Sequence, residues 1–345
     1  MIWLSWRQLR IQAAAAAVAV AAAAIVLAVT GPHLADLTGI VFDQLTRTDR
    51  FLYFAGIVAV AVAPALLGAF WGAPLVAREL EGGTQRLVWT QSVTRGRWLA
   101  TRLGLAVLAA AVAMGVLTLA VTWWAAPLDG VQSETRGSLP ARLTPVAFGM
   151  RGIVPVAYGV FAVALGVAIG AVLRRSLAAM AVTLAVYVFV QIAVPAWVRP
   201  HLIPPVRETV TIGSTTLDGV SLRGDGPGAV TTITAHTADP GDWVLANRTI
   251  DPSGRAIDGL PSWFAQCLPP PPSPAGPPAG PARVAGKDGL ITCIDRLSAE
   301  GYRQQLVYQP ASRFWALQWA ETGMFVGLSA LLAWFSLWWV RRRLT

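Results

Sequence analysis

Charged residues are scarce in this sequence of 345 residues. Asp, Glu, Lys and Arg make up only 13% of the chain, and hydrophobic residues make up 55%. A soluble globular protein carries about 25% charged residues. This composition excludes an ordinary soluble domain and indicates a membrane protein, which we expect in the cell membrane.

Lysine is almost absent, because Lys287 is the only one. A nucleotide-binding P-loop needs a Gly-Lys pair followed by Ser or Thr, since its lysine reaches the β- and γ-phosphates. Asp288 follows Lys287, so the chain has no Walker A motif. ATP hydrolysis by this chain is therefore not predicted.

Residues typical of catalytic and metal sites are few as well. The three histidines, His33, His201 and His236, lie far apart and have no companion ligands at metal-binding spacing. No Gly-x-Ser-x-Gly motif of a serine hydrolase occurs. We predict no enzyme activity, no metal site and no cofactor in this chain.

The formal net charge of +9 is the one feature that points toward nucleic acid. However, the arginines gather at the ends of apolar runs, where lipid headgroups and topology signals account for them. No basic stripe interleaved with aromatic residues occurs in a polar region. The lipid bilayer is the expected partner of these charges, and nucleic acid is not.

Six apolar stretches have the roughly 20 residues that a membrane-spanning helix needs. They are Gln12–Thr30, Phe51–Val76, Leu99–Ala126, Ile153–Leu173, Leu177–Val198 and Phe314–Val340. Small residues, as in Gly159–Gly170, would let these helices approach closely, unless they only reflect an Ala-rich composition. Residues 1–11 precede the first span and have an apolar face, which predicts an amphipathic helix lying along the inner interface.

The arginines also orient the spans. With the N-terminus inside, most of them fall on inner segments, as the positive-inside rule requires. The inner set is Arg7, Arg10, Arg78, Arg86, Arg95, Arg97, Arg102, Arg174, Arg175, Arg341, Arg342 and Arg343; the outer or boundary set is Arg47, Arg50, Arg136, Arg142 and Arg151. The predicted fold is an all-α polytopic membrane protein with six spans at 12–198 and 313–345 and with both termini cytoplasmic.

The long polar region at 199–312, between the fifth and sixth spans, predicts a small β-rich extracellular domain. "VRETVTIG" and "AVTTITAH" are β-branched, and "WVLANRTIDPSGRAI" resembles two strands around a turn. A Pro-rich segment at 268–282 is expected to be extended. Cys267 and Cys293 flank it, and an exported pair of cysteines usually forms a disulfide. Two free thiols are the alternative.

Glu321 is the only acidic residue well inside a predicted span. A buried ionisable group in a membrane suggests a proton or ion pathway. The alternative, which we favour, is a structural pair with Arg151, at the outer start of the fourth span, that holds two helices together.

A polar segment at 77–98 interrupts the apolar runs between the second and third spans. Gly82 and Gly83 can end the second helix, and Thr94 is a good N-cap for the third. This pattern predicts a helical elbow along the inner surface, with its charged side toward the cytoplasm.

In this elbow the sequence resembles the permease subunits of type-2 ABC exporters. The residues that carry the resemblance are Glu79, Gly83, Thr84, Val93-Thr94-Arg95, Trp98 and Arg102. The chain departs from the family pattern at Ser92, where a proline is usual, and at Arg102, where a lysine is usual. "YQPASRFWALQWAETG" at 308–323 is similar to the sixth-span entry of actinobacterial members that carry a large extracellular domain.

The resemblance implies a function for the elbow, which in this family is the coupling helix that docks on an ATP-binding subunit. The implied coupling residues are Glu79, Glu81, Gly83, Thr84, Arg95 and Arg97. For Arg97 and Arg102, anchoring at the lipid headgroups is an equal alternative.

The resemblance also implies partners. They are two copies of an ABC ATP-binding subunit, which would hold ATP and Mg, and a second permease copy, most simply in a homodimer. The expected substrate is lipophilic, a lipid or a peptide. Two other functions stay open: a peptide-sensing or immunity-type receptor that uses the extracellular domain, and an ion-coupled carrier that uses Glu321.

Overall fold

The computed structural model describes residues 2–36, 46–82, 94–134, 142–223, 230–267 and 287–343. These residues form two compact units. Met1–Ile203 and Ser312–Thr345 make up the helical unit, and Pro204–Ala311 make up the inserted unit.

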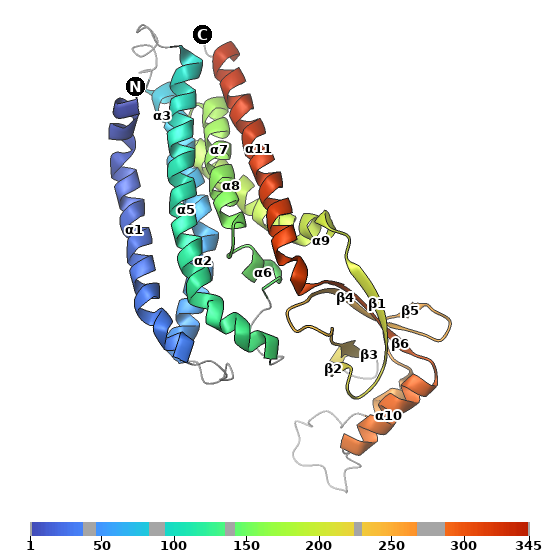
Figure 1. Cartoon of the computed structure of the whole chain (residues 1–345). Coiled ribbons are helices and arrows are strands. Elements are labelled where there is room, and N and C mark those ends of the chain that lie inside the picture. Colours follow the sequence, from blue (N-terminus) through green and yellow to red (C-terminus); the bar gives the residue numbers. More distant parts are fainter. Residues whose placement is uncertain are drawn as a thin grey trace, which may run out of the picture. The chain divides into compact units, whose positions relative to one another are not determined.

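The helical unit is a bundle of long helices (Figure 1). Its elements are α1 (Ile2–Asp36), α2 (Arg47–Leu67), the π-helix η2 (Gly68–Gly72), α3 (Ala73–Glu81), α5 (Arg95–Glu134), α6 (Pro145–Phe148), α7 (Val154–Leu173), α8 (Ser176–Ala193), the π-helix η3 (Val194–Val198), α9 (Arg199–Leu202), the 3-10 turn η5 (Ala311–Arg313) and α11 (Phe314–Arg343). Six segments are long and apolar enough to cross a membrane, and each contains most or all of one predicted span. The prediction of six spans is confirmed.

Both chain ends lie at one end of this bundle, which we call the terminal end (Figure 1). The side chain of Arg341 near the end of α11 lies against Gly96 at the start of α5, so these two helix ends are also neighbours. The opposite end of the bundle, the far end, carries α6 and α9 (Figure 1).

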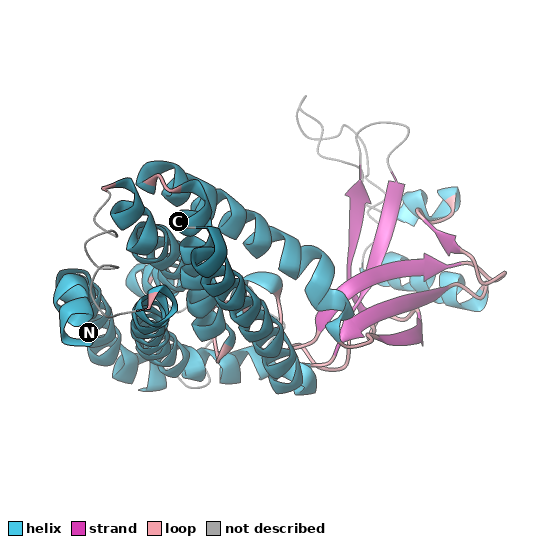
Figure 2. Cartoon of the chain, turned by 90° about the horizontal axis from the view of Figure 1, so that it is seen from above, coloured by secondary structure: helices cyan, strands magenta, loops and turns pink. Residues whose placement is uncertain are grey.

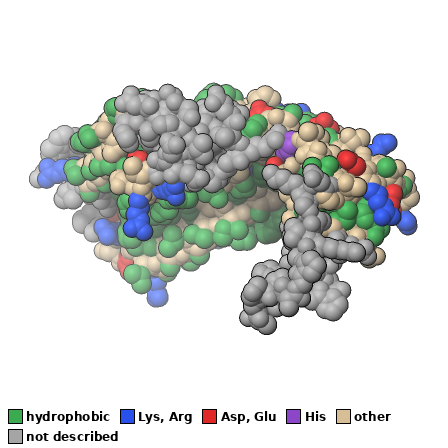
Figure 3. Space-filling view, turned by 90° about the horizontal axis from the view of Figure 1, so that it is seen from below, with side chains coloured by type: hydrophobic (Ala, Val, Ile, Leu, Met, Phe, Trp, Pro, Cys, Tyr) green, Lys and Arg blue, Asp and Glu red, His purple; other side chains and the backbone are tan. Residues whose placement is uncertain are grey.

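Helix α7 forms the centre of the bundle. In its most apolar window 72% of the residues are buried, against at most 39% in any other span. Hydrophobic side chains cover much of the face in Figure 3, and Leu177 and Leu119 are 83% and 71% exposed. Such apolar exposure suits helices that face lipid.

Glycines allow the second span to cross α7 at backbone distance. A Cβ added at Gly72 would lie 2.6 Å from the carbonyl oxygen of Val163, and one added at Gly166 would lie 2.6 Å from the amide nitrogen of Ala73. Gly170 likewise faces the carbonyl oxygen of Ala73. The close approach expected from the small residues of Gly159–Gly170 is therefore present, and side chains larger than hydrogen do not fit there.

The placement of residues 1–11 along the inner membrane surface stays a prediction. Helix α1 runs without a break from Ile2 to Asp36, so residues 2–11 continue into the first span as one helix. The reason is the Ala-rich run that follows Gln12, since alanine has the highest helix propensity and nothing there interrupts the helix. The side chain of Trp124 in α5 donates a hydrogen bond to Thr30 at 2.9 Å and ties the two helices together.

The inserted unit contains the described strands of the chain (Figure 2). They are β1 (Val206–Thr211), β2 (Leu217–Arg223), β3 (Val230–Ala235), β4 (Trp243–Ile250), β5 (Ala256–Ile257) and β6 (Arg303–Gln309). An antiparallel sheet has the order β1-β6-β4-β5, and β2 pairs with β3. The predicted strand pair around the Pro-Ser-Gly turn is confirmed as β4 and β5, with Thr249 opposite Ile257.

A buried polar network joins the two sheets. Gln304 in β6 is fully buried and donates hydrogen bonds to the carbonyl oxygen of Ile233 at 3.0 Å and to Asn247 Oδ1 at 2.6 Å. Asn247 in turn donates to the carbonyl oxygen of Ala235. The side-chain amide of the buried Gln304 therefore has protein partners for its hydrogen bonds, as buried polar groups usually do.

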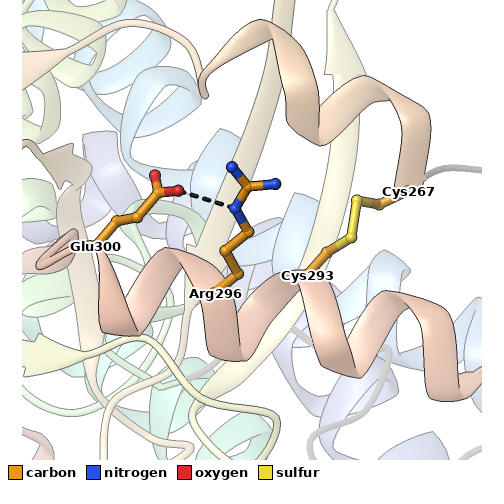
Figure 4. The surroundings of a disulfide bond; sticks show 4 residues. All are labelled: Cys267, Cys293, Arg296 and Glu300. Carbon is orange, nitrogen blue, oxygen red and sulfur yellow. Dashed lines mark hydrogen bonds and ion pairs between the residues drawn. A yellow bond between two sulfur atoms is a disulfide. The ribbon is translucent and has the colours of Figure 1, made fainter.

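Cys267 and Cys293 form a disulfide (Figure 4), so the predicted bond is present and the free-thiol alternative is not. Cys267 ends the 3-10 helix η4 (Ser262–Cys267), and Cys293 lies in α10 (Lys287–Ala299). The Pro-rich segment at 268–282 lies outside the described residues.

Helix α10 was not predicted, although the sequence carries its signal. Leu290, Ile294 and Leu297 recur at helical spacing, and the last two are buried with Phe264 in the core of this unit. The neighbouring prolines suggested an extended segment, but no proline lies between Lys287 and Ala299 to interrupt a helix.

Candidate functional site

The predicted elbow connects the end of α3 to the start of α5, and both of these helix ends lie at the terminal end of the bundle. Glu81 is the last residue of α3, and the amide of Gly82 donates to the carbonyl oxygen of Arg78 at 3.0 Å. Thr94 precedes α5, and its side chain accepts a hydrogen bond from the amide of Arg97. The predicted helix end at Gly82 and the N-cap at Thr94 are therefore confirmed.

An ion pair holds these two helix ends together. Arg102 Nη1 in α5 donates to Glu79 Oε1 in α3, and both side chains are largely buried. The guanidinium of Arg102 also lies over the ring of Trp98, 4.7 Å from its centroid. The structure therefore gives Arg102 a specific partner in the protein, beyond the general headgroup anchoring that was its alternative.

Glu81 makes a different contact, to the start of α8. Its Oε2 accepts hydrogen bonds from the amide of Ser176, at 3.0 Å, and from the Ser176 hydroxyl. Ser176 was not singled out from the sequence, because nothing in a single chain shows which helix end lies next to another. The two acids of α3 thus bind two different spans.

Apolar side chains support both contacts from within the bundle. Val76 of α3, Trp98 and Leu99 of α5, Val167 of α7 and Val340 of α11 form one buried cluster. This packing holds α3 and α5 firmly against the central helix. The helix ends on both sides of the predicted elbow are therefore part of the packed bundle.

The other predicted coupling residues are placed only in part. Gly83 and Thr84 lie outside the described residues, as does the middle of the elbow at 83–93. Arg95 starts α5, but its side chain is outside the described part of the structure. Arg97 is exposed at the same helix start, so its charge is available to a partner.

Comparison with known families agrees with this arrangement. The family model described as ABC-2 membrane transporter related matches residues 2–199, which is more than half of the chain. The chain belongs to this ABC-2 family. It is therefore a multi-pass protein of the cell membrane and a permease-type component of an ABC transporter. The chain matches no curated protein and no solved structure.

A second polar cluster lies in the ABC-2 permease at the far end, around Glu321 of α11. Arg199 Nε donates to Glu321 Oε2 at 2.7 Å, and both side chains are fully buried. Arg199 Nη2 donates to Glu321 Oε1 and to the Tyr158 hydroxyl, each at 3.1 Å, and Tyr158 itself donates to Glu321. Both carboxylate oxygens of Glu321 are thus occupied by protein donors.

This cluster corrects the predicted partner of Glu321, which is Arg199 and not Arg151. Arg151 is buried elsewhere, with its guanidinium 5.7 Å from the ring centroid of Tyr53. The sequence places Arg199 at the start of the polar region, because it follows the fifth apolar run. Helix α9 continues the fifth span beyond η3, and α11 runs back into the bundle from the far end. Arg199 and Glu321 therefore lie at the same level along the bundle.

Gln318, one turn before Glu321, completes the packing of the far end. It is fully buried, and its Oε1 accepts from the amides of Ile153 and Val154, each at 3.0 Å. These amides start α7, where they have no helical partner. Its Nε2 donates to the carbonyl oxygen of Arg151. Gln318 therefore fixes the start of the central helix to α11.

An apolar cavity of about 560 Å³ adjoins this cluster. The second span, α6, α7 and the fifth span contribute its walls. Tyr187 and Gln191 of α8 supply polar groups, and Gln191 donates to the Tyr187 hydroxyl at 2.7 Å. In the described part of the chain, no cluster of three or more His, Cys, Asp or Glu side chains is arranged to hold a metal ion.

Proposed function

We propose that this ABC-2 family member is the membrane subunit of an ATP-driven exporter. A separate ATP-binding subunit docks on the segment at 77–98 and closes on ATP and Mg. The working assembly contains two permease copies, most simply a homodimer, and two ATP-binding subunits.

The observation that carries this proposal is the Glu79–Arg102 pair. It joins the two flanks of the docking segment, so a partner that displaces the segment moves α3 and α5 together. Arg78 and Arg97 add positive charge at the same flanks. The apolar cavity at the far end supports a lipophilic, lipid or peptide substrate.

Removing Glu79 or Arg102 is expected to weaken both ATPase binding and ATPase stimulation. Both side chains of the pair are largely buried, so the charge that remains in a single variant has lost its partner. This lowers the free energy of unfolding by about 1–3 kcal/mol. The measurement is a pull-down from detergent after co-expression with candidate ABC ATP-binding subunits from the same genome, using Glu79→Ala, Arg102→Ala and the double variant.

The double variant is the decisive comparison. If Glu79 and Arg102 act as a pair, the loss of ATPase binding in the double variant equals the loss in a single variant. If each residue contacts the ATPase independently, the two losses add up in the double variant. Arg95→Ala and Arg97→Ala test direct contacts between the elbow and the ATPase. Arg207→Ala is the matched control, because it removes an exposed arginine from β1 in the inserted unit. If the native chain captures no ATPase, the proposal fails and the receptor and ion-coupled alternatives return.

The proposed orientation places the termini in the cytoplasm and the inserted unit outside. The two native cysteines are joined in the disulfide, so an introduced cysteine is the only reactive thiol. Arg255→Cys, in the exposed β4–β5 turn, is expected to react with a membrane-impermeant maleimide on intact cells. Arg342→Cys, at the end of α11, should react only after permeabilisation, and the reverse pattern would contradict the orientation.

A further inference from the structure

The start of α8 lacks a cap of its own. Arg174 ends α7 in the left-handed conformation, with φ of 56°, and Arg175 is extended at the N-cap position of α8. The Arg175 side chain makes no capping hydrogen bond. The first amides of a helix need acceptors from outside the helix, and carboxylates are favoured there by the helix dipole.

Glu81 of α3 supplies that acceptor. It binds both the amide and the hydroxyl of Ser176, so two bonds fix its carboxylate to the first residue of α8. Because this contact is exposed at the terminal end, it contributes little to folding stability. The contact instead joins the end of α3 to the start of α8, so that a movement of one helix end can displace the other.

We propose that Glu81 is a positioning residue that transmits the displacement of the docking segment to the fifth span. This inference rests on the proposed function and adds a second output to it. Glu79 moves α5 through Arg102, and Glu81 moves α8 through Ser176. A hydrogen-bonded helix moves as a unit, so the displacement reaches Tyr187 and Gln191, which line the cavity at the far end.

The test measures movement at the start of α8 without a known substrate. Leu177, next to Ser176, is 83% exposed, and Leu177→Cys provides a unique reactive thiol. Its maleimide labelling rate is compared with and without ATP plus vanadate, in the complex of the full chain with its co-expressed ATPase. ATPase binding and ATP hydrolysis are measured on the same samples.

Three variants separate transmission from simple capping. Glu81→Ala removes the acceptor, whereas Glu81→Gln keeps an oxygen that can accept both bonds. Glu81→Ala combined with Arg175→Ser gives α8 a serine N-cap of its own but no connection to α3. Arg175→Ser alone controls for the lost arginine.

The proposal predicts an ATP-dependent labelling change in the native sequence and in Glu81→Gln. It predicts loss of that change in Glu81→Ala and in the double variant when the samples are compared at equal amounts of bound ATPase. Recovery in the double variant, or an unaltered response in Glu81→Ala, would overturn it and leave the proposed function standing. A native chain that binds no ATPase would overturn both.

Discussion

Replacing Glu321 by alanine is expected to destabilise the helical unit by about 3–5 kcal/mol, because it leaves the fully buried guanidinium of Arg199 without its counter-charge. Arg199→Met should cost a similar amount by stranding the carboxylate. Tyr158→Phe removes one donor and keeps the ion pair, so we expect a smaller loss of about 1–3 kcal/mol. Thermal unfolding in detergent, followed by size-exclusion chromatography, measures all three.

The combined Arg199→Met/Glu321→Leu variant separates a structural pair from a functional acid. Replacing both charges by apolar groups is often close to neutral, so the double variant should be more stable than either single one. If its stability and its ATPase coupling both recover, the pair only holds α9 to α11. Transport that stays lost in a stable double variant with intact ATPase coupling would return Glu321 to the ion-coupled hypothesis, and single variants of native stability would refute the buried-pair argument.

Gly166→Leu is expected to prevent the native crossing of the second span over α7. The side chain would meet backbone atoms of Gly68 and Ala73, which cannot rotate away as a side chain can. Overpacking costs about 1–3 kcal/mol even where neighbouring side chains adjust, so we expect the loss here at or above the upper end. The measurement is the fraction of monodisperse protein extracted from membranes, together with its unfolding temperature.

Gly327→Leu in α11 is the matched control for this variant. A Cβ added at Gly327 meets nothing within 4 Å, and the residue is exposed. Leucine has a higher helix propensity than glycine, so this change should be neutral or slightly stabilising. Equal losses in the two variants would show that the crossing has no special requirement for glycine.

The spans could be predicted because each is specified by its own residues. Hydropathy and length identify a membrane helix without knowledge of its neighbours, and the caps at Gly82 and Thr94 are equally local signals. The strand pair around the Pro-Ser-Gly turn is of the same kind. In these segments the local pattern and the observed structure agree.

The contacts between elements could not be predicted in the same way. Pairing of Glu321 with Arg199 depends on the depth at which two helices meet, and the sequence alone does not show that Arg199, and not Arg151, reaches that depth. The Ser176 contact depends on which helix ends adjoin. Helix α10 was missed for another reason: proline-rich sequence on its N-terminal side outweighed an apolar spacing that was present.

The Arg199–Glu321 pair has a consequence for how the fold tolerates changes in the inserted unit. Arg199 is the last residue matched by the family model, and Glu321 lies beyond the inserted unit, so this bond joins the two sides of the insertion within the helical unit. Loop-closure entropy grows only logarithmically with length, by about 0.6 kcal/mol for each doubling. We therefore expect the six spans to keep their packing when residues are added to or removed from the inserted unit.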